Sequence, residues 1–311
     1  MVIAKKRAWL AAAALALVCA GLAGGLMWWR SRTLATPAAL VARVPSRDAV
    51  VLYIDFAALR RAGLLQLLAG SQMTAEPEYR AFVGKTRFDY AADLDAAAVS
   101  FAPSGRYVAA RGRFDWDKLR AYAAESRGTC TGGFCRMAGS TPERNISWMP
   151  LQKSVLALAV SRDDQAAETM RRPDPDARPM DAPRDAVWLS LPPAALKSGG
   201  ELPAGTRMFA RSLENADSIA FSLGPDGPRF AVRMDVRCRA AADAGTLVEA
   251  LARATGMVRE FIVREHQTPN PRDLSGVLSG GAFRAQGARV FGYWPVERVF
   301  FEELFRGGGP S

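Results

Sequence analysis

Histidine is nearly absent from this chain, and several catalytic signatures are missing altogether. The 311 residues contain one histidine, His266, which excludes centres built from several histidines and leaves Ser-His-Asp chemistry a single candidate base. No serine lies in a G-x-S-x-G or S-x-x-K pattern, and neither G-x-x-x-x-G-K-[ST] nor G-x-G-x-x-G is present. We therefore expect no metal, no cofactor and no cradle for a nucleotide phosphate.

The overall charge is positive, with 41 Lys and Arg against 31 Asp and Glu. A basic balance raises the question of nucleic-acid binding, because Lys and Arg supply the salt-dependent part of that affinity. The cations are spread along the chain, however, and one of the densest runs, VRMDVRCR, alternates with apolar residues as a strand does. We therefore expect a solvated surface of mixed charge and no nucleic-acid partner.

The first segment has the composition of a membrane anchor. A run of 22 uncharged residues from Ala8 to Trp29 is long enough to cross a hydrocarbon core of about 30 Å as a helix. Trp28 and Trp29 stand where an interfacial aromatic belt is expected. Basic residues flank the run on both sides: Lys5, Lys6, Arg7, Arg30 and Arg32. The pattern predicts an uncleaved signal anchor that binds the lipid bilayer.

Two other interpretations of this segment stay open. A cleaved signal peptide has an apolar part of about 7–15 residues that ends in small residues, whereas this run is longer and ends in tryptophan and arginine. Cys19 could mark a lipid-modified start, but ten more uncharged residues follow it. Because the compact basic cluster lies on the short N-terminal tail, we expect a single-pass inner-membrane protein with a cytoplasmic N-terminus and a periplasmic body.

Two of the four cysteines lie close together. Cys130 and Cys135 bracket the loop CTGGFC, in which Gly132 and Gly133 permit a tight reversal. In an oxidising compartment this pair would form a structural disulfide. Free thiols are an alternative; redox or metal chemistry has less support, because the usual redox spacing is Cys-x-x-Cys and no further ligands cluster nearby.

The chain contains an internal repeat. RDAVVLYIDFAAL, from Arg47, returns as RDAVWLSLPPAAL, from Arg184, 137 positions later. A second block follows in the same order, because DAAAVSFAPSG, from Asp95, pairs without gaps with DSIAFSLGPDG, from Asp217, at an offset of 122. The first copy therefore has 15 extra residues, which we interpret as an added helix that begins near Pro77. Two matches in one order indicate duplication.

Each copy continues with a hairpin. The 122 offset extends past turns at Pro103-Ser104-Gly105 and Pro225-Asp226-Gly227. In the second copy the residues after the turn alternate between apolar and mostly polar, the period of a strand with one buried face. The apolar members are Phe230, Val232, Met234, Val236 and Cys238.

A helix follows each hairpin, and further strands and a closing helix end each copy. In the long helix of the second copy we expect one apolar stripe, formed by Leu247, Leu251, Ala254, Val258 and Phe261. The position of His266 near the end of this helix is explained by the helix dipole. Pro295 is expected in the first turn of the closing helix.

These patterns predict an α+β protein, with an N-terminal transmembrane helix followed by two tandem copies of a mainly antiparallel sheet-plus-helix unit. Whether the two sheets merge stays open. The expected divisions are a cytoplasmic tail and signal anchor over 1–32, a juxtamembrane linker over 33–44, the first repeat over 45–171, a proline-rich linker over 172–183, the second repeat over 184–306 and a flexible tail over 307–311.

Two carboxylates are enough for the active site of a glycoside hydrolase, so the acidic clusters of the chain are candidate catalytic residues. The clusters are Asp89, Asp93 and Asp95, Asp115 and Asp117, and Glu302 and Glu303. Each has a simpler explanation at a helix start, in a turn or on a helix face. Asp55 follows the strand VVLYI, but the second copy has Pro192 there, so we interpret Asp55 as a helix cap.

Three blocks, RGRFDWDKL, PNPRDLSGVLSGGAFR and GYWPVERVFFEEL, together with the anchor, resemble a group of membrane-anchored envelope proteins of acidobacterial type with a duplicated α+β unit. The resemblance implies a location in the cell envelope and no activity.

The leading functional hypothesis is a non-catalytic, membrane-tethered periplasmic interaction protein, a scaffold or an assembly factor with an envelope protein as its partner. The alternative is an envelope hydrolase that uses paired carboxylates.

Overall fold

The computed structural model describes residues 35–65, 77–139, 141, 143–177, 180–181, 183–192, 195, 209, 212–213 and 216–305. The anchor predicted over residues 1–32, including Ala8, Trp28, Trp29 and their basic flanks, lies outside these residues, as does the tail 307–311. Across the described part of the chain, no helix is both long and apolar enough to span a bilayer.

In the first half of the chain, the described residues form seven strands. Its elements are α2 (Pro37–Val41), β1 (Val50–Ile54), α3 (Phe56–Arg61), α6 (Pro77–Thr86), α7 (Tyr90–Asp93), β2 (Leu94–Ala102), β3 (Gly105–Gly112), α8 (Trp116–Glu125), β4 (Thr129–Thr131), β5 (Phe134–Ala138), β6 (Asn145–Gln152), β7 (Val155–Ser161) and the 3₁₀ helix η1 (Ala166–Arg171). The helix expected in the first copy near Pro77 is confirmed as α6.

The second half contributes five strands. Its elements are β8 (Val187–Leu191), β9 (Ser218–Asp226), β10 (Arg229–Arg237), α11 (Ala241–Arg264), α12 (Leu274–Ser279), β11 (Ala282–Gln286), β12 (Arg289–Val296) and α13 (Arg298–Phe305). Pro295 was predicted in the closing helix, and this prediction is wrong. It lies in β12 opposite Ala231, and α13 begins three residues later.

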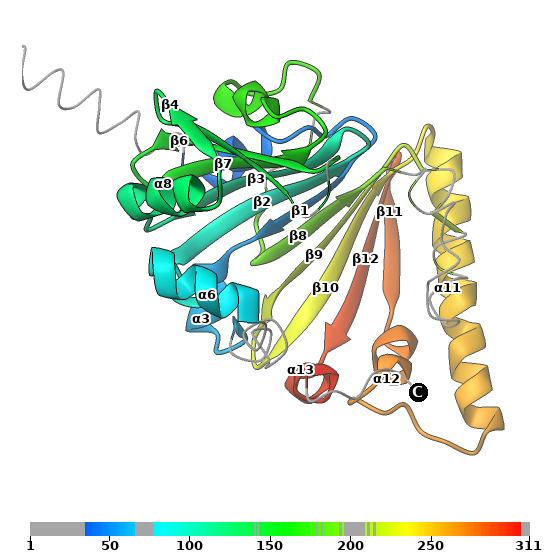
Figure 1. Cartoon of the computed structure of the whole chain (residues 1–311). Helices are drawn as coiled ribbons and strands as arrows, with labels where there is room; N and C mark the ends of the chain where they lie inside the picture. Colours follow the sequence, from blue (N-terminus) through cyan, green and yellow to red (C-terminus); the bar gives the residue numbers. More distant parts are fainter. Residues whose placement is uncertain are drawn as a thin grey trace, which may run out of the picture.

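All twelve strands form one antiparallel sheet, in the order β11-β12-β10-β9-β8-β1-β2-β3-β7-β6-β5-β4. Figure 1 shows the strands fanning from β4 to β11, with α8 and α11 near opposite ends of the sheet. The mixed α+β class with a mainly antiparallel sheet is therefore confirmed. The two repeats share a single continuous sheet, joined where β1 pairs with β8.

The junction between β1 and β8 has approximate twofold symmetry. Leu52 lies opposite Leu189, its own equivalent at the offset of 137. On either side, Val51 faces Ser190, the equivalent of Tyr53, and Tyr53 faces Trp188, the equivalent of Val51. This reciprocity is the geometry of an isologous contact between two copies of one unit.

The next strand pair repeats the same register. Leu52 pairs with Val99 in the first half, and Leu189 pairs with Phe221 in the second, which are the positions that the 137 and 122 offsets relate. Ala98 is then equivalent to Ala220, and Ser100 to Ser222. The offsets found in the sequence are thus also the offsets between structurally equivalent residues in these strands.

The turn of the second hairpin differs from the prediction. Asp226 pairs with Arg229 across Gly227 and Pro228, so Pro225 and Asp226 belong to β9. Gly227 has a φ of +62°, a conformation that glycine adopts without the penalty of a Cβ atom, and this fixes the turn two residues later than in the first copy. Successive side chains of a strand point to opposite faces, so moving the turn by two residues leaves each side chain on its predicted face. Met234 and Val236 therefore lie on the buried side, as predicted.

Each half has its own apolar core. In the second half, α11 packs Leu247, Leu251 and Ala254 against the sheet, where Met234, Val236 and Trp294 are buried with them. This side of the sheet is the α11 face. Phe261 was predicted on the same stripe, but its side chain is 61% exposed and Ile262 is buried instead, because the spacing from Ala254 through Val258 continues by four residues to 262.

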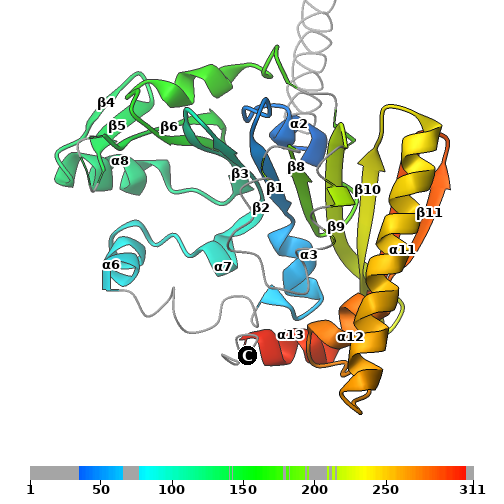
Figure 2. The ribbon, with the colours of Figure 1, turned by 90° about the vertical axis from the view of Figure 1, so that its right-hand side faces the viewer.

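The opposite side of the sheet, the α2 face, is covered in the first half. Alanines on β2, β3 and β7 have short side chains that let α2 and η1 approach closely, and Leu40 and Met170 are fully buried against them. Residues 33–44 were predicted as a linker; the structure corrects this for the part it describes, because α2 belongs to the core. Figure 2 shows α2 near one end of the strands, and α12 and α13 near the other.

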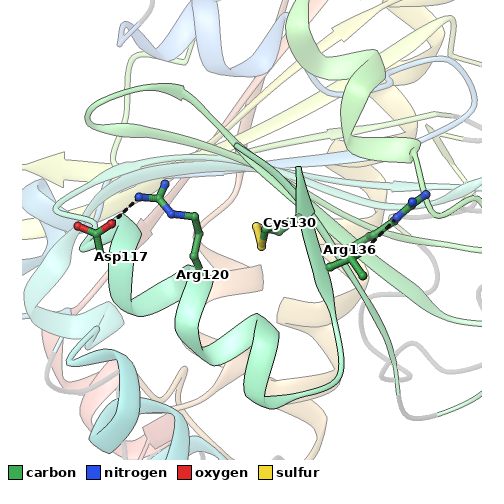
Figure 3. The surroundings of a disulfide bond; sticks show 6 residues. Asp117, Arg120, Cys130 and Arg136 are labelled. Carbon is green, nitrogen blue, oxygen red and sulfur yellow. Dashed lines mark hydrogen bonds and ion pairs between the residues drawn. A yellow bond between two sulfur atoms is a disulfide. The ribbon is translucent and has the colours of Figure 1, made fainter. Parts of the chain in front are cut away.

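The disulfide predicted between Cys130 and Cys135 is confirmed. The two residues face each other across the β4–β5 hairpin, beside α8, as Figure 3 shows for Cys130. On the same helix Arg120 binds Asp117 at 2.5 Å, and on the hairpin Arg136 binds Asp164 at 3.1 Å. Cys238 packs partly buried against the core of the second half.

Truncating Leu251 and Phe261 on the same helix tests the observed helix face. We expect Leu251→Ala to lower the free energy of unfolding by about 2–5 kcal/mol, because it leaves a cavity against the sheet. Phe261→Ala should change it by less than about 0.5 kcal/mol. Urea unfolding of the two variants measures both; equal losses would contradict the placement of α11.

Candidate functional site

The α2 face has a different character in the second half. The register places Arg233, Asp235 and Arg237 of β10 where the first half has Tyr107, Ala109 and Arg111. Tyr107 and Ala109 are buried under apolar cover. Their charged counterparts line a cavity instead. One sheet therefore has an apolar, covered area and a charged, open area on the same face.

The open area exists because the covering elements diverge between the halves. After β7, η1 turns onto the α2 face and buries Ala167 and Met170 there. After β12, α13 packs in another cluster, where Phe301 contacts Phe230 at a ring distance of 5.4 Å. Phe230 belongs to the α11 side of β10, so α13 leaves the α2 face of its own half uncovered.

The resulting cavity has a volume of about 430 Å³. Four arginines and three aspartates provide its charges: Arg184, Arg233, Arg237, Arg289, Asp181, Asp185 and Asp235. Trp188 and Phe291 contribute aromatic surface, and Ser190, Ser218 and Ser222 contribute hydroxyl groups. The charged lining therefore has one more positive than negative group.

The described residues before β8, namely 180, 181 and 183–186, form the pre-β8 segment, which is held against the sheet by two ion pairs. Asp185 lies 3.4 Å from Arg233, and Asp181 lies 3.3 Å from Arg237. The two aspartates are four positions apart in sequence, as are the two arginines on β10. The pre-β8 segment is thus fastened to one strand at two points, with the cavity beside it.

Ser222 and Gly224 of β9 fix the position of Asp185. The Ser222 hydroxyl donates a hydrogen bond of 2.5 Å to Asp185 Oδ2. Ser100, its equivalent in the first half, donates to the carbonyl of Pro45 at 2.5 Å, so both halves attach the segment before their first strand in this way. A Cβ atom at Gly224 would lie 2.3 Å from Asp185 Oδ1, so a larger residue there requires the Asp185 side chain to move.

Arg289 connects the pre-β8 segment to β10 and β12. Its guanidinium donates to both carboxylate oxygens of Asp235 and to Asp181 Oδ2, the latter at 2.8 Å. Partial burial opposes ionisation of Asp181, but the hydrogen bond from Arg289 and the charges of Arg289 and Arg237 outweigh it and lower the pKa of this carboxyl group. Asp181 is therefore ionised at neutral pH.

Most of the carboxylates singled out in the sequence have structural roles. Asp55, Asp89 and Asp115 each accept a hydrogen bond from a backbone N–H in the first turn of a helix, which confirms the interpretation of Asp55 as a cap. Hydrogen bonds from the Lys118 backbone and side chain lower the pKa of Asp115.

The other members of these clusters lie on the surface in ion pairs or turns. Asp93 and Asp95 are within 4.0 Å of arginines on or after β3, Asp117 binds Arg120, and Glu302 lies near Arg298 on α13 with Glu303 beside it in sequence. None of them lines the cavity. His266 follows the end of α11, with a φ of 54°, and its solvent-exposed side chain is remote from the cavity lining in sequence and in the fold.

The residues of the cavity were not identified as a site in the sequence. Residues 172–183 were predicted as an exposed linker. Asp181 is exposed, but it pairs with two arginines, and Pro183 is buried, which corrects the prediction at that position. A usable signal was the run VRMDVRCR, whose polar positions Arg233, Asp235 and Arg237 share one face of a strand. Their partners come from distant segments, which spacing alone does not reveal.

Chemically, this site is suited to binding. Each aspartate of the lining contacts at least one guanidinium, so each carboxylate already takes part in an ion pair within the site. Within the described residues, no group of acidic, cysteine or histidine side chains is arranged to hold a metal ion. The lining offers donors, acceptors and aromatic surface to a polar ligand.

Comparisons with known proteins give a distant fold likeness. No family model matches the chain, and no curated protein matches it. Among solved structures, crystal forms I, III and IV of TP0453 match with TM-scores of 0.47, 0.49 and 0.46 and sequence identities of 11%, 11% and 12%. The matches cover 86% of this chain and 95%, 96% and 94% of those chains. A likeness at this level does not indicate a function.

A substitution at Gly224 tests the attachment of the pre-β8 segment. We expect Gly224→Ala to destabilise the protein by about 1–3 kcal/mol, because the new Cβ atom overlaps the Asp185 carboxylate. Asp185→Ala added to Gly224→Ala should remove most of the clash, so the two losses should be strongly non-additive. Thermal unfolding of the single and double variants measures this coupling, and simple additivity would contradict the contact.

Proposed function

We propose that this protein is a membrane-tethered, extracytoplasmic binding protein of the bacterial cell envelope that acts without catalysis. The observation that supports it best is the cavity on the α2 face, where four arginines and three aspartates surround about 430 Å³ and every aspartate is paired. A site of this kind recognises a polar ligand by complementary charge and hydrogen bonds.

The envelope location is supported by two independent features. The uncharged run from Ala8 to Trp29, with its aromatic end and basic flanks, is typical of a signal anchor. The Cys130–Cys135 disulfide fits an oxidising compartment, since cytosolic thiols are kept reduced. Both features favour a periplasmic body behind an inner-membrane anchor.

A protein partner is favoured by the outer side of α11. Near its C-terminal end, Met257, Phe261 and Val263 are 51%, 61% and 70% exposed. Met257 and Phe261 are four residues apart, so their side chains lie on one side of the helix. Grouped apolar side chains of this size on a surface are typical of protein contacts, which fits a scaffold or an assembly factor.

A carboxylate-dependent hydrolase is the second candidate. The observation in its favour is that Asp181 and Asp235 both contact Arg289, so two carboxylates lie close together in one cavity. An acid–base pair, however, needs one carboxyl group with a raised pKa, and the pKa of Asp181 is lowered. Binding is therefore the better-supported role.

The compartment is tested by the oxidation state of the disulfide in cells. In a chain with Cys19→Ser and Cys238→Ser, only Cys130 and Cys135 remain. We expect no modification when cells are lysed in acid and treated with a maleimide-linked polymer, and two additions after reduction. Proteinase K added to intact spheroplasts should remove the body. Two additions without reductant, together with protection from the protease, would refute an extracytoplasmic location.

The partner surface is tested by photo-crosslinking in native membranes. A photoreactive residue at position 261 should give a discrete adduct with an envelope protein. The control is the same residue at exposed Glu249 on the same helix, which is about 120° away around the axis and should give none. Matching adducts at both positions, or no adduct at 261, would count against this surface.

A further inference from the structure

We propose that Arg237 and Arg289 form a phosphate-binding subsite in the cavity, and that the carboxylate of Asp181 fills this subsite in the structure. This inference rests on the binding role proposed above and names the chemical class of the ligand. It follows from the way in which one exposed carboxylate meets two guanidinium groups.

The geometry is that of an internal anion between two arginines. One oxygen, Asp181 Oδ2, accepts hydrogen bonds from Arg289 at 2.8 Å and from Arg237 at 3.3 Å. Within the described residues, Arg237 forms its ion pair with Asp181, whereas Arg289 binds both Asp181 and Asp235. The N–H donors of a guanidinium group match the spacing of oxygens in both carboxylate and phosphate groups.

The contact is accessible and weak, as a displaceable group requires. The Asp181 side chain is 60% exposed, and Arg237 and Arg289 are 42% and 37% exposed. Ion pairs at such exposure contribute little to stability, so an entering anion can displace this carboxylate. Asp181 also lies on the pre-β8 segment rather than on a strand of the sheet, so it can leave the arginines without a change in the sheet.

The charge of the lining favours phosphate over carboxylate. With Asp181 displaced, the cavity lining holds the four arginines Arg184, Arg233, Arg237 and Arg289 against two aspartates, Asp185 and Asp235, which leaves two excess positive charges. Arg233 also contacts Asp226, at 3.8 Å, outside the lining. A phosphate monoester has a charge of about −1.5 to −2 at pH 7. It also offers more oxygens than a carboxylate, so Arg184, which also lines the cavity, is available as a third donor.

The test uses the full chain in a non-ionic detergent at low ionic strength, with inorganic phosphate as the probe in calorimetric titrations. We expect Asp181→Asn to bind phosphate about fivefold more tightly than the unmodified chain, because the competing charge is gone while the side-chain shape is kept. The matched control is Asp164→Asn, which breaks an exposed pair with Arg136 of β5, near the other end of the sheet from the cavity, and should leave the affinity unchanged.

A second variant tests whether the gain is due to this subsite. Arg237→Gln added to Asp181→Asn should abolish the gain, and because both side chains are largely exposed, the melting temperature should stay close to that of the parent. Equal affinities of the unmodified chain and Asp181→Asn, or a gain that survives Arg237→Gln, would overturn the proposal.

Short-chain phosphatidic acid below its micelle concentration distinguishes the two sources of such a ligand. If Asp181→Asn strengthens binding of this lipid more than that of inorganic phosphate, the subsite takes a lipid headgroup; equal strengthening assigns it to a soluble phosphate ester. No gain for either probe contradicts the subsite. These titrations do not depend on the compartment of the protein, so their failure is separate from a failure of the topology and crosslinking experiments.

Discussion

The pairing of β1 with β8 holds the two halves of this protein in one sheet. Because Leu52 meets its own equivalent, Leu189, the two repeats are joined by reciprocal contacts of the kind found between identical subunits. Strands in the middle of a sheet satisfy their backbone groups on both edges. The junction therefore fixes the relative position of both cores, and with it which parts of the two halves share a face.

Because the halves share a face, the difference between them lies on one surface of the protein. In the first half the α2 face is apolar and carries α2 and η1, so it serves stability. In the second half the same face carries Arg233, Asp235 and Arg237, and the closing helix packs elsewhere. Duplication followed by divergence thus accounts for one covered and one open area on a single sheet, and the cavity lies in the open area beside the junction.

The pre-β8 segment beside the cavity is held by other interactions than the two apolar cores. The cores depend on tightly packed, buried side chains such as Leu40, Met170 and Leu251, whose removal is costly. The pre-β8 segment depends on hydrogen bonds and ion pairs that are partly solvated, and such contacts are individually weak. A rigid scaffold with a weakly attached segment beside a charged cavity suits a protein that binds a ligand without reshaping its fold.

The sequence by itself determined the duplication, the α+β class, the antiparallel hairpins and the Cys130–Cys135 disulfide, because all of these depend on local periodicity, turn chemistry or short spacing. From the sequence, Phe261 was predicted on the buried stripe of α11, but packing against the sheet sets the phase of this helix. The turn of the second hairpin was predicted two residues too early, because its position is set by Gly227. Only the tertiary structure decided that the sheets merge, that α13 leaves its half of the α2 face open, and that Asp181 meets Arg237 and Arg289. The reason is physical: these contacts join segments that are far apart in the sequence, by 137 positions for Leu52 and Leu189 and by 108 for Asp181 and Arg289. The pairing of such distant segments depends on the free energy of the whole fold.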